Sequence, residues 1–201
     1  MEAPDTKREQ IIEAALKRFA HFGMGKTTMA EIAKDLNLSK ALLYYYFPDK
    51  TGLYATVLDR LFSSGEKEFG KHLKKVKTSA EGIAAYIDLR HSFIEKYFTL
   101  LEPSNFTELE NHPDLIKLFE KAREQEKRHF TEIIKIDIDR GTSHVSDPEA
   151  MAELLFEAIL GLRMLLIKNL KSHFRLDKEI LARIADRQKQ FAFIFLKGLN
   201  A

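Results

Sequence analysis

Apolar residues recur at three- and four-residue spacing along almost the whole chain, and this periodicity restricts the fold more than any other feature. Such spacing places apolar side chains on one face of an α-helix, whereas half-buried strands alternate at every second residue. Ile12, Leu16 and Phe19 form one such stripe. No segment shows convincing strand alternation, and no internal repeat is found. The sequence therefore predicts an all-α protein of about nine helices.

Capping residues mark the expected helix boundaries. Thr28 and Glu31 form a capping box for a short second helix, and Ser39 caps a third helix that ends before Pro48. Asp49 caps a longer fourth helix. The other helices are expected at residues 6–22, 78–101, 103–113, 113–141, 148–170 and 177–199.

Composition excludes several classes of protein. The 201 residues include no cysteine, which excludes disulfide frameworks, thiolate zinc sites and cysteine nucleophiles. The N-terminal thirty residues lack an apolar signal core, and Glu157, Arg163 and Lys168 interrupt the most apolar stretch. A membrane span needs roughly 20 predominantly apolar residues. We therefore expect a soluble, cytoplasmic protein without a cofactor or a metal site.

Residues 27–47 carry the pattern of a helix-turn-helix. Two short helices are joined by a tight turn at Asn37 and Leu38, and Ala33 is small where the helices would cross. The second of these helices would project Lys40 and two tyrosines outward, which is unusual for a solvated face and typical of a groove-reading helix. A basic surface bias over residues 17–50, with six Lys or Arg against three acids, is compatible with phosphate but equally with a solvated face.

These residues resemble the N-terminal signature of the TetR family of transcriptional regulators. The similarity is dense over residues 8–55 and rests on Thr27-Thr28, Ile32-Ala33, Ser39, Leu43-Tyr44, Tyr46-Phe47, Lys50 and Leu53. Beyond residue 60 it rests on helix number and length. One position departs from the family pattern, because Ala41 stands where glycine is usual, and adjusted DNA contacts are expected there.

The resemblance implies a DNA-binding domain at residues 1–50 and a larger helical ligand-binding and dimerisation domain at residues 51–201. It implies that Lys40, Ala41, Leu42 and Tyr44 meet base edges or thymine methyl groups, and that Thr27, Tyr45, Tyr46 and Lys50 hold phosphates. Thr28 and Ser39 complete the predicted DNA-binding set. For Tyr44 and Tyr46 a partly structural role stays open.

Residues 78–170 are rich in aromatic side chains at helical spacing. The resemblance implies a ligand pocket in this region, between the fifth, seventh and eighth helices of the chain. Aromatic stripes of this kind belong more often to a core than to a pocket. The candidate lining residues are Phe93, Tyr97, Phe119, Arg123, Phe130, Phe156 and Leu160. The last two helices carry more apolar surface than one core needs, which favours a homodimer. The candidate interface residues are Ile159, Leu162, Leu166, Ile184, Phe191 and Phe195.

Two short motifs fail as nucleotide or metal sites. Gly25-Lys26-Thr27 resembles the end of a phosphate-binding loop, but Ala20 occupies the position of the required glycine and a helix precedes it. Asp137 and Asp139 resemble the start of a calcium loop, but Gly141 stands at the third ligand position.

No catalytic motif is present, so an enzyme is not expected. The resemblance to the TetR family implies a repressor released from a palindromic DNA operator by an apolar or amphipathic small molecule. A constitutive DNA-binding protein, or a helical module that binds protein partners without a ligand, remains open.

Overall fold

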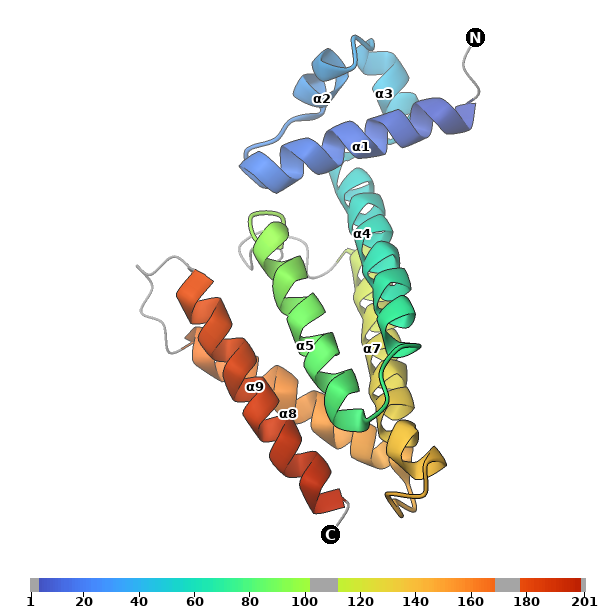
Figure 1. Cartoon of the computed structure of the whole chain (residues 1–201). Helices are drawn as coiled ribbons and strands as arrows, with labels where there is room; N and C mark the ends of the chain where they lie inside the picture. The colour runs from blue at the N-terminus through green and yellow to red at the C-terminus, as the bar shows by residue number, and fades with distance from the viewer. Residues whose placement is uncertain (1–3, 102–111, 169–177, 200–201) are drawn as a thin grey trace. The chain divides into compact units, whose positions relative to one another are not determined.

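The computed structural model describes residues 4–101, 112–168 and 178–199, and every regular element in these ranges is an α-helix. In chain order they are α1 (Pro4–Phe22), α2 (Met29–Asp35), α3 (Lys40–Tyr46), α4 (Lys50–Leu73), α5 (Ser79–Lys96), α7 (Pro113–Asp139), α8 (Pro148–Lys168) and α9 (Lys178–Leu199) (Figure 1). The all-α prediction is confirmed. The short helix expected between Pro103 and Pro113 lies outside the described residues, as does the side chain of Asp177.

The predicted capping residues begin their helices. Thr28 and Glu31 form a reciprocal capping box at α2, and the Ser39 hydroxyl accepts the Leu42 N–H at 3.1 Å. Asp49 caps α4 by accepting the Gly52 N–H at 2.7 Å. Each of these bonds satisfies a backbone donor that the first helical turn leaves without a partner.

The prediction of a fifth helix reaching Leu101 was too long. Helix α5 ends at Lys96, and residues 97–101 form turns. The Leu101 N–H donates to the Tyr97 carbonyl, and the buried Tyr54 hydroxyl donates to the Leu100 carbonyl at 2.6 Å. Tyr54 lies far away in the sequence, so this tertiary bond is invisible to helical periodicity.

The chain divides into two compact units. The first contains residues 1–64 and 96–121, and the second contains residues 65–95 and 122–201. Helices α4 and α7 each contribute residues to both. The predicted functional division at residue 50 is a different boundary, and it stays a prediction.

The first unit is built around the N-terminal helices. Ile11, Phe19, Ile32 and Leu43 are completely buried in its interior. The Phe19 and Tyr54 rings meet edge to face with their centroids 5.3 Å apart, which joins α1 to α4.

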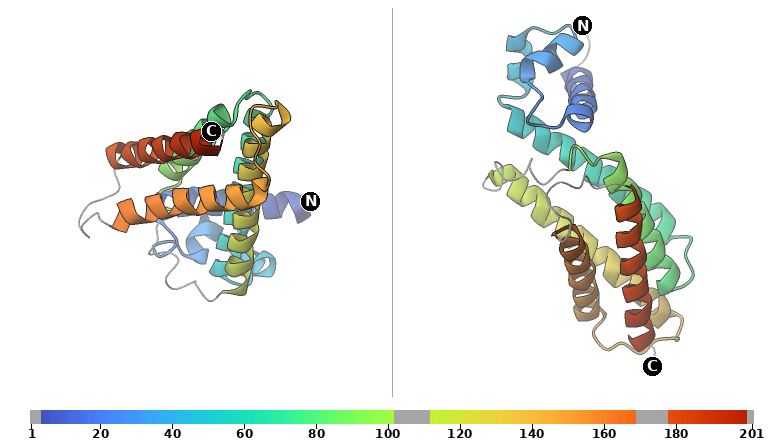
Figure 2. Two further views of the ribbon diagram at one scale, coloured as in Figure 1. Left: turned by 90° about the horizontal axis from the view of Figure 1, so that it is seen from below. Right: turned by 90° about the vertical axis from the view of Figure 1, so that its left-hand side faces the viewer.

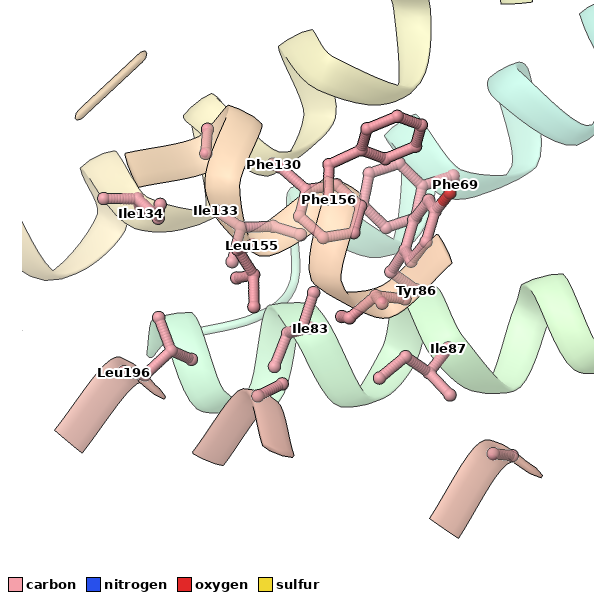
Figure 3. Close-up of a cluster of buried hydrophobic side chains, with 14 residues drawn as sticks. Phe69, Ile83, Tyr86, Ile87, Phe130, Ile133, Ile134, Leu155, Phe156 and Leu196 are labelled. Carbon is pink, nitrogen blue, oxygen red and sulfur yellow. The ribbon is translucent and has the colours of Figure 1, made fainter. Parts of the chain in front are cut away.

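The second unit has its own core, formed by α5, α7, α8, α9 and the end of α4 (Figure 3). Tyr86 lies at its centre, with its ring edge to face against both Phe69 and Phe130. Helices α8 and α9 lie side by side (Figure 2). Within the described ranges, no helix is long and apolar enough to cross a membrane.

Candidate nucleic-acid interface and sensor cavity

The turn between α2 and α3 is closed by backbone hydrogen bonds. The Ala33 carbonyl accepts the N–H groups of Leu36 and Leu38, the latter at 2.9 Å. Asn37 adopts a positive φ of 52°, a left-handed conformation that asparagine tolerates better than most residues. These bonds fix the direction in which α3 leaves the turn, as a helix-turn-helix requires.

Helix α3 has one face in the core and one face in solvent. Leu43 is completely buried, and Phe47 at its end is 4% exposed. Tyr44 and Tyr45 are 47% and 79% exposed, and Leu42 is 38% exposed. The short helix therefore presents large apolar and hydroxyl-bearing side chains outward, an expensive arrangement for a surface without a partner.

The remaining predicted residues of this helix lie on or beside the outward face. Lys40 and Ala41 are exposed, as is the capping residue Ser39. Tyr46 is half-buried, and its ring meets that of Tyr45 edge to face at 5.3 Å. The outward face combines an ammonium group, hydroxyls and aliphatic carbon, and these can address guanine, phosphate and the thymine methyl group respectively.

Ion pairs between helices fix the position of this motif. Arg18 on α1 forms two parallel hydrogen bonds with Asp35 at the end of α2, at 2.5 and 2.8 Å. The hydrogen bond from Arg18 holds the pKa of the Asp35 carboxyl below its ordinary value. Arg60 on α4 contacts Glu9 on α1 at 2.9 Å. The paired guanidinium of Arg18 adds geometric precision, because its two donors fit both carboxylate oxygens.

Two residues that were predicted to contact phosphates, Thr27 and Lys50, make hydrogen bonds inside the first unit. Thr27 is completely buried, and its hydroxyl donates to the Gly23 carbonyl at 2.8 Å. The Lys50 ammonium donates to the carbonyls of Met24 and Thr27 at 3.0 and 3.1 Å. These contacts tie the loop before α2 to the start of α4. The Thr27 hydroxyl is thus part of the interior, whereas Thr28 beside it is exposed and caps α2.

Comparisons with known proteins agree with this geometry. Residues 11–57, which include the whole helix-turn-helix, match the family model for bacterial regulatory proteins of the tetR family. A crystal structure of a transcriptional regulator from Cytophaga hutchinsonii is 32% identical, covers 98% of this chain and 100% of its own, and superposes with a TM-score of 0.85. The chain belongs to the TetR family.

Other relatives support the same assignment. YhgD, an HTH-type transcriptional regulator of Bacillus subtilis, is 27% identical over 97% of both chains. YuxN of the same organism is 29% identical over 66% of this chain, but the match spans only 44% of YuxN. A regulator from Saccharomonospora viridis solved in complex with choline shares the fold, with 18% identity and a TM-score of 0.70 over 96% of both chains.

Membership makes the protein a DNA-binding transcriptional regulator. TetR-family regulators are not enzymes, as the sequence predicted.

The second unit of this TetR-family protein contains a small cavity of about 20 Å³. A cavity of this size holds about one water molecule. Its walls come from α5, α7, α8 and α9, and the lining residues are Tyr86, Ile87, Arg90, Glu126, Phe130, Phe156, Ile159, Leu160, Arg163 and Gln188.

A charged cluster forms the polar part of the cavity wall. Arg90 and Glu126 form an ion pair. Burial and the nearby Glu126 carboxylate raise the pKa of the Tyr86 hydroxyl above its ordinary value. Burial opposes the charge on Arg90, but the neighbouring Glu126 carboxylate raises its pKa above the ordinary value. Burial and the positive charge of Arg90 lower the pKa of Arg163.

The structure brings only part of the predicted ligand pocket together. Phe130, Phe156 and Leu160 line the cavity. Sequence reasoning missed its charged residues, because a charged side chain within a helix is most often solvated. The nearest sequence signal was Arg163, which interrupts the otherwise apolar helix α8.

Four predicted pocket residues do not line this cavity. Tyr97 and Phe119 belong to the first unit, where Phe119 is 38% exposed with its ring 6.1 Å from that of Phe62. Arg123 is exposed and pairs with Glu157 at 3.4 Å. Phe93 instead lies beside Gly65. Their aromatic or charged character was compatible with a pocket, but the neighbouring helices direct them elsewhere.

The predicted dimer residues are divided between the core and the surface. Ile159 and Ile184 are 6% and 5% exposed, so they pack inside the unit and are not available to a second copy. Leu162, Phe191 and Phe195 are half-buried, and the side chain of Leu166 lies outside the described residues. Among the described side chains of α8 and α9, the exposed large apolar ones are Leu154, Met164, Leu165, Phe193 and Ile194. These five were not predicted.

Proposed function

We propose that this regulator acts as a homodimer that inserts the two copies of α3 into successive major grooves of a palindromic operator. The observation that carries the proposal is the outward face of α3, with Tyr44 and Tyr45 exposed on a helix anchored by the buried Leu43. In helix-turn-helix dimers the two recognition helices lie about 34–36 Å apart, one turn of duplex. A cytoplasmic location accompanies this role.

Within this proposal, Lys40, Ala41, Leu42 and Tyr44 contact base edges, while Tyr45 and Tyr46 contact phosphates. Thr28, Ser39 and Lys50, which lie at the ends of their helices, hold the DNA backbone. The Thr27 hydroxyl acts indirectly, because its hydrogen bond to the Gly23 carbonyl shapes the loop and leaves it buried away from phosphate. Together these groups combine positioning by phosphate contacts with sequence reading by base contacts.

The second part of the proposal is release of the operator by a small molecule bound in the cavity of the second unit. The cavity combines an apolar wall with a few convergent polar groups, which is the usual composition of a small-molecule site. The regulator from Saccharomonospora viridis, which shares this fold, was crystallised in complex with choline, so a protein of this architecture can hold a small molecule. A ligand shifts the DNA-binding equilibrium only as far as its affinities for the two states differ.

A gel shift with the DNA upstream of the protein's own gene tests the proposal. We expect a retarded complex at low salt that weakens steeply as salt rises, because cations are released from phosphates on binding. No retardation at low salt would contradict DNA recognition. A complex that no small molecule releases would favour the constitutive alternative.

A further inference from the structure

The wall of the cavity in the second unit carries more positive than negative charge. Arg90 and Arg163 each contribute one positive charge, whereas Glu126 contributes the single carboxylate among the lining residues. Arg90 uses its guanidinium for the ion pair with Glu126. One positive charge therefore remains without compensation in the lining.

Arg163 is the uncompensated cation. Among the residues that the structure describes, no carboxylate lies within ion-pair distance of its guanidinium, although Arg90 and Glu126 both act on it electrostatically. A half-buried guanidinium is costly without a partner, since both Coulomb attraction and hydrogen bonds are lost.

A second unsatisfied donor lies in the same wall. The Nε–H group of Arg90 is buried and has no hydrogen-bond partner within the described parts of the chain. Gln188, also in the lining, donates its side-chain N–H to the Ile159 carbonyl at 2.8 Å. Glu126 Oε1 is a buried acceptor of the same wall without a hydrogen-bond partner among the described residues, but it forms the ion pair with Arg90, so the excess of charge in the lining is positive.

The opposite part of the lining is apolar. Phe130, Phe156, Ile159 and Leu160 supply carbon surface beside the guanidinium groups. A ligand that fits this wall has a short apolar body and an acceptor-rich head. A carboxylate is such a head, since its two oxygens accept parallel hydrogen bonds from one guanidinium.

We infer that the effector is a small amphipathic anion, a carboxylate with a short apolar body, held by Arg163 with help from the Nε–H of Arg90. This inference rests on the proposed function of the cavity as an effector site. Because the cavity holds only about one water molecule, an organic anion enters by displacing the apolar side chains of the lining.

A cationic effector fits this wall poorly. The carboxylate of Glu126 is already paired with Arg90. A cation would have to break that pair and would meet the positive charge of Arg163 at short range, where the low dielectric strengthens repulsion.

Calorimetric titration of the full chain with three probes of one chain length tests the inference. The probes are hexanoate, hexylammonium and hexan-1-ol, which share an apolar body and differ in charge. We expect hexanoate to bind at least tenfold more tightly than hexylammonium and more tightly than hexan-1-ol. Equal or tighter binding of hexylammonium would overturn the inference, as would the absence of hexanoate binding at millimolar concentration.

Two substitutions at Arg163 locate the anion. Arg163→Met removes a charge without an ion-pair partner, so the variant should fold, and we expect at least a tenfold loss of hexanoate affinity. Arg163→Lys keeps the charge but loses the planar fork, and an intermediate affinity is expected. Arg123→Met is the matched control, because Arg123 lies on the surface of the same unit. Unchanged hexanoate affinity in Arg163→Met would refute the site.

A gel shift with the same probes separates this inference from the proposed function. Release of DNA by hexan-1-ol but not by hexanoate would leave the effector mechanism standing and overturn the preference for an anion. Binding of hexanoate through Arg163 without any effect on the DNA complex would confirm the anion site and contradict operator release.

Discussion

Asp137 shows how one buried carboxylate positions a helix of the second unit. It is 9% exposed, and one of its oxygens accepts the Ser79 N–H at 3.0 Å while the other accepts the Ser79 hydroxyl. Ser79 is the first residue of α5, so a side chain of α7 satisfies a backbone donor that the first turn of α5 leaves free. Helix α5 also supplies Tyr86 and Arg90 to the cavity.

Replacing this carboxylate should destabilise the protein. Asp137→Ala leaves two donors of Ser79 buried without partners, which costs about 1–3 kcal/mol each when a buried group loses its bond. We expect the free energy of unfolding from urea titration to fall by at least about 1 kcal/mol. The exposed Asp139 on the same helix is the control. An Asp137→Ala variant as stable as Asp139→Ala would contradict the assigned role.

At the scale of the elements, α3 is a short helix that begins at a single capping residue, Ser39. It has only seven residues, and isolated helices of this length are unstable in water. The Ser39 hydroxyl satisfies the Leu42 N–H, and Leu43 anchors the helix in the core. The predicted recognition surface therefore exists only while this cap and this anchor hold the helix.

Removal of the cap should open α3 locally. Ser39→Ala is expected to cost about 0.5–2 kcal/mol, the usual effect of losing an N-cap side chain. Amide hydrogen exchange in α3 should accelerate correspondingly, while exchange in α1 stays unchanged. Ser39→Asn keeps a capping oxygen and should restore protection. Equal protection in wild type and Ser39→Ala would show that the hydroxyl does not stabilise the helix.

Helix boundaries were predictable where a local bond sets them. Thr28, Ser39 and Asp49 each cap the helix that their sequence position indicated, because capping involves residues only three positions apart. The end of α5 was not predictable, since it involves Tyr54 from a distant helix. The dependence on contacts between distant helices also explains why the predicted dimer residues are divided between the core and the surface. Periodicity shows that Ile159 and Leu162 share a helix, but only packing decides which side meets the core.

At the scale of the whole molecule, exposed apolar side chains on α8 and α9 are our candidates for the interface of the proposed dimer. Leu154 and Leu165 are 50% and 57% exposed and lie three helical turns apart, so they share one face of α8. Ile194 on α9 is 73% exposed. Exposed apolar surface of this kind is typical of a subunit interface.

The proposed dimer makes a direct prediction about mass. The 23.2 kDa chain should sediment at twice its own mass. Ile194→Asp places a charge in the proposed interface and should shift the protein to the monomer, because burying an unpaired carboxylate is costly. Ile116→Asp, at an exposed residue of α7, is the control and should leave the dimer intact. A wild-type mass of 23.2 kDa would contradict the dimer.

We propose that the outward face of α3 reads DNA, and fluorescence anisotropy with a labelled fragment from the protein's own promoter tests this role most directly. At fixed low salt, the Lys40→Ala, Tyr44→Ala double variant should bind at least tenfold more weakly than wild type, because each base contact contributes about 1–3 kcal/mol. Lys67→Ala, at an exposed lysine of the second unit, should bind like wild type. Unchanged affinity in the folded double variant would contradict the account.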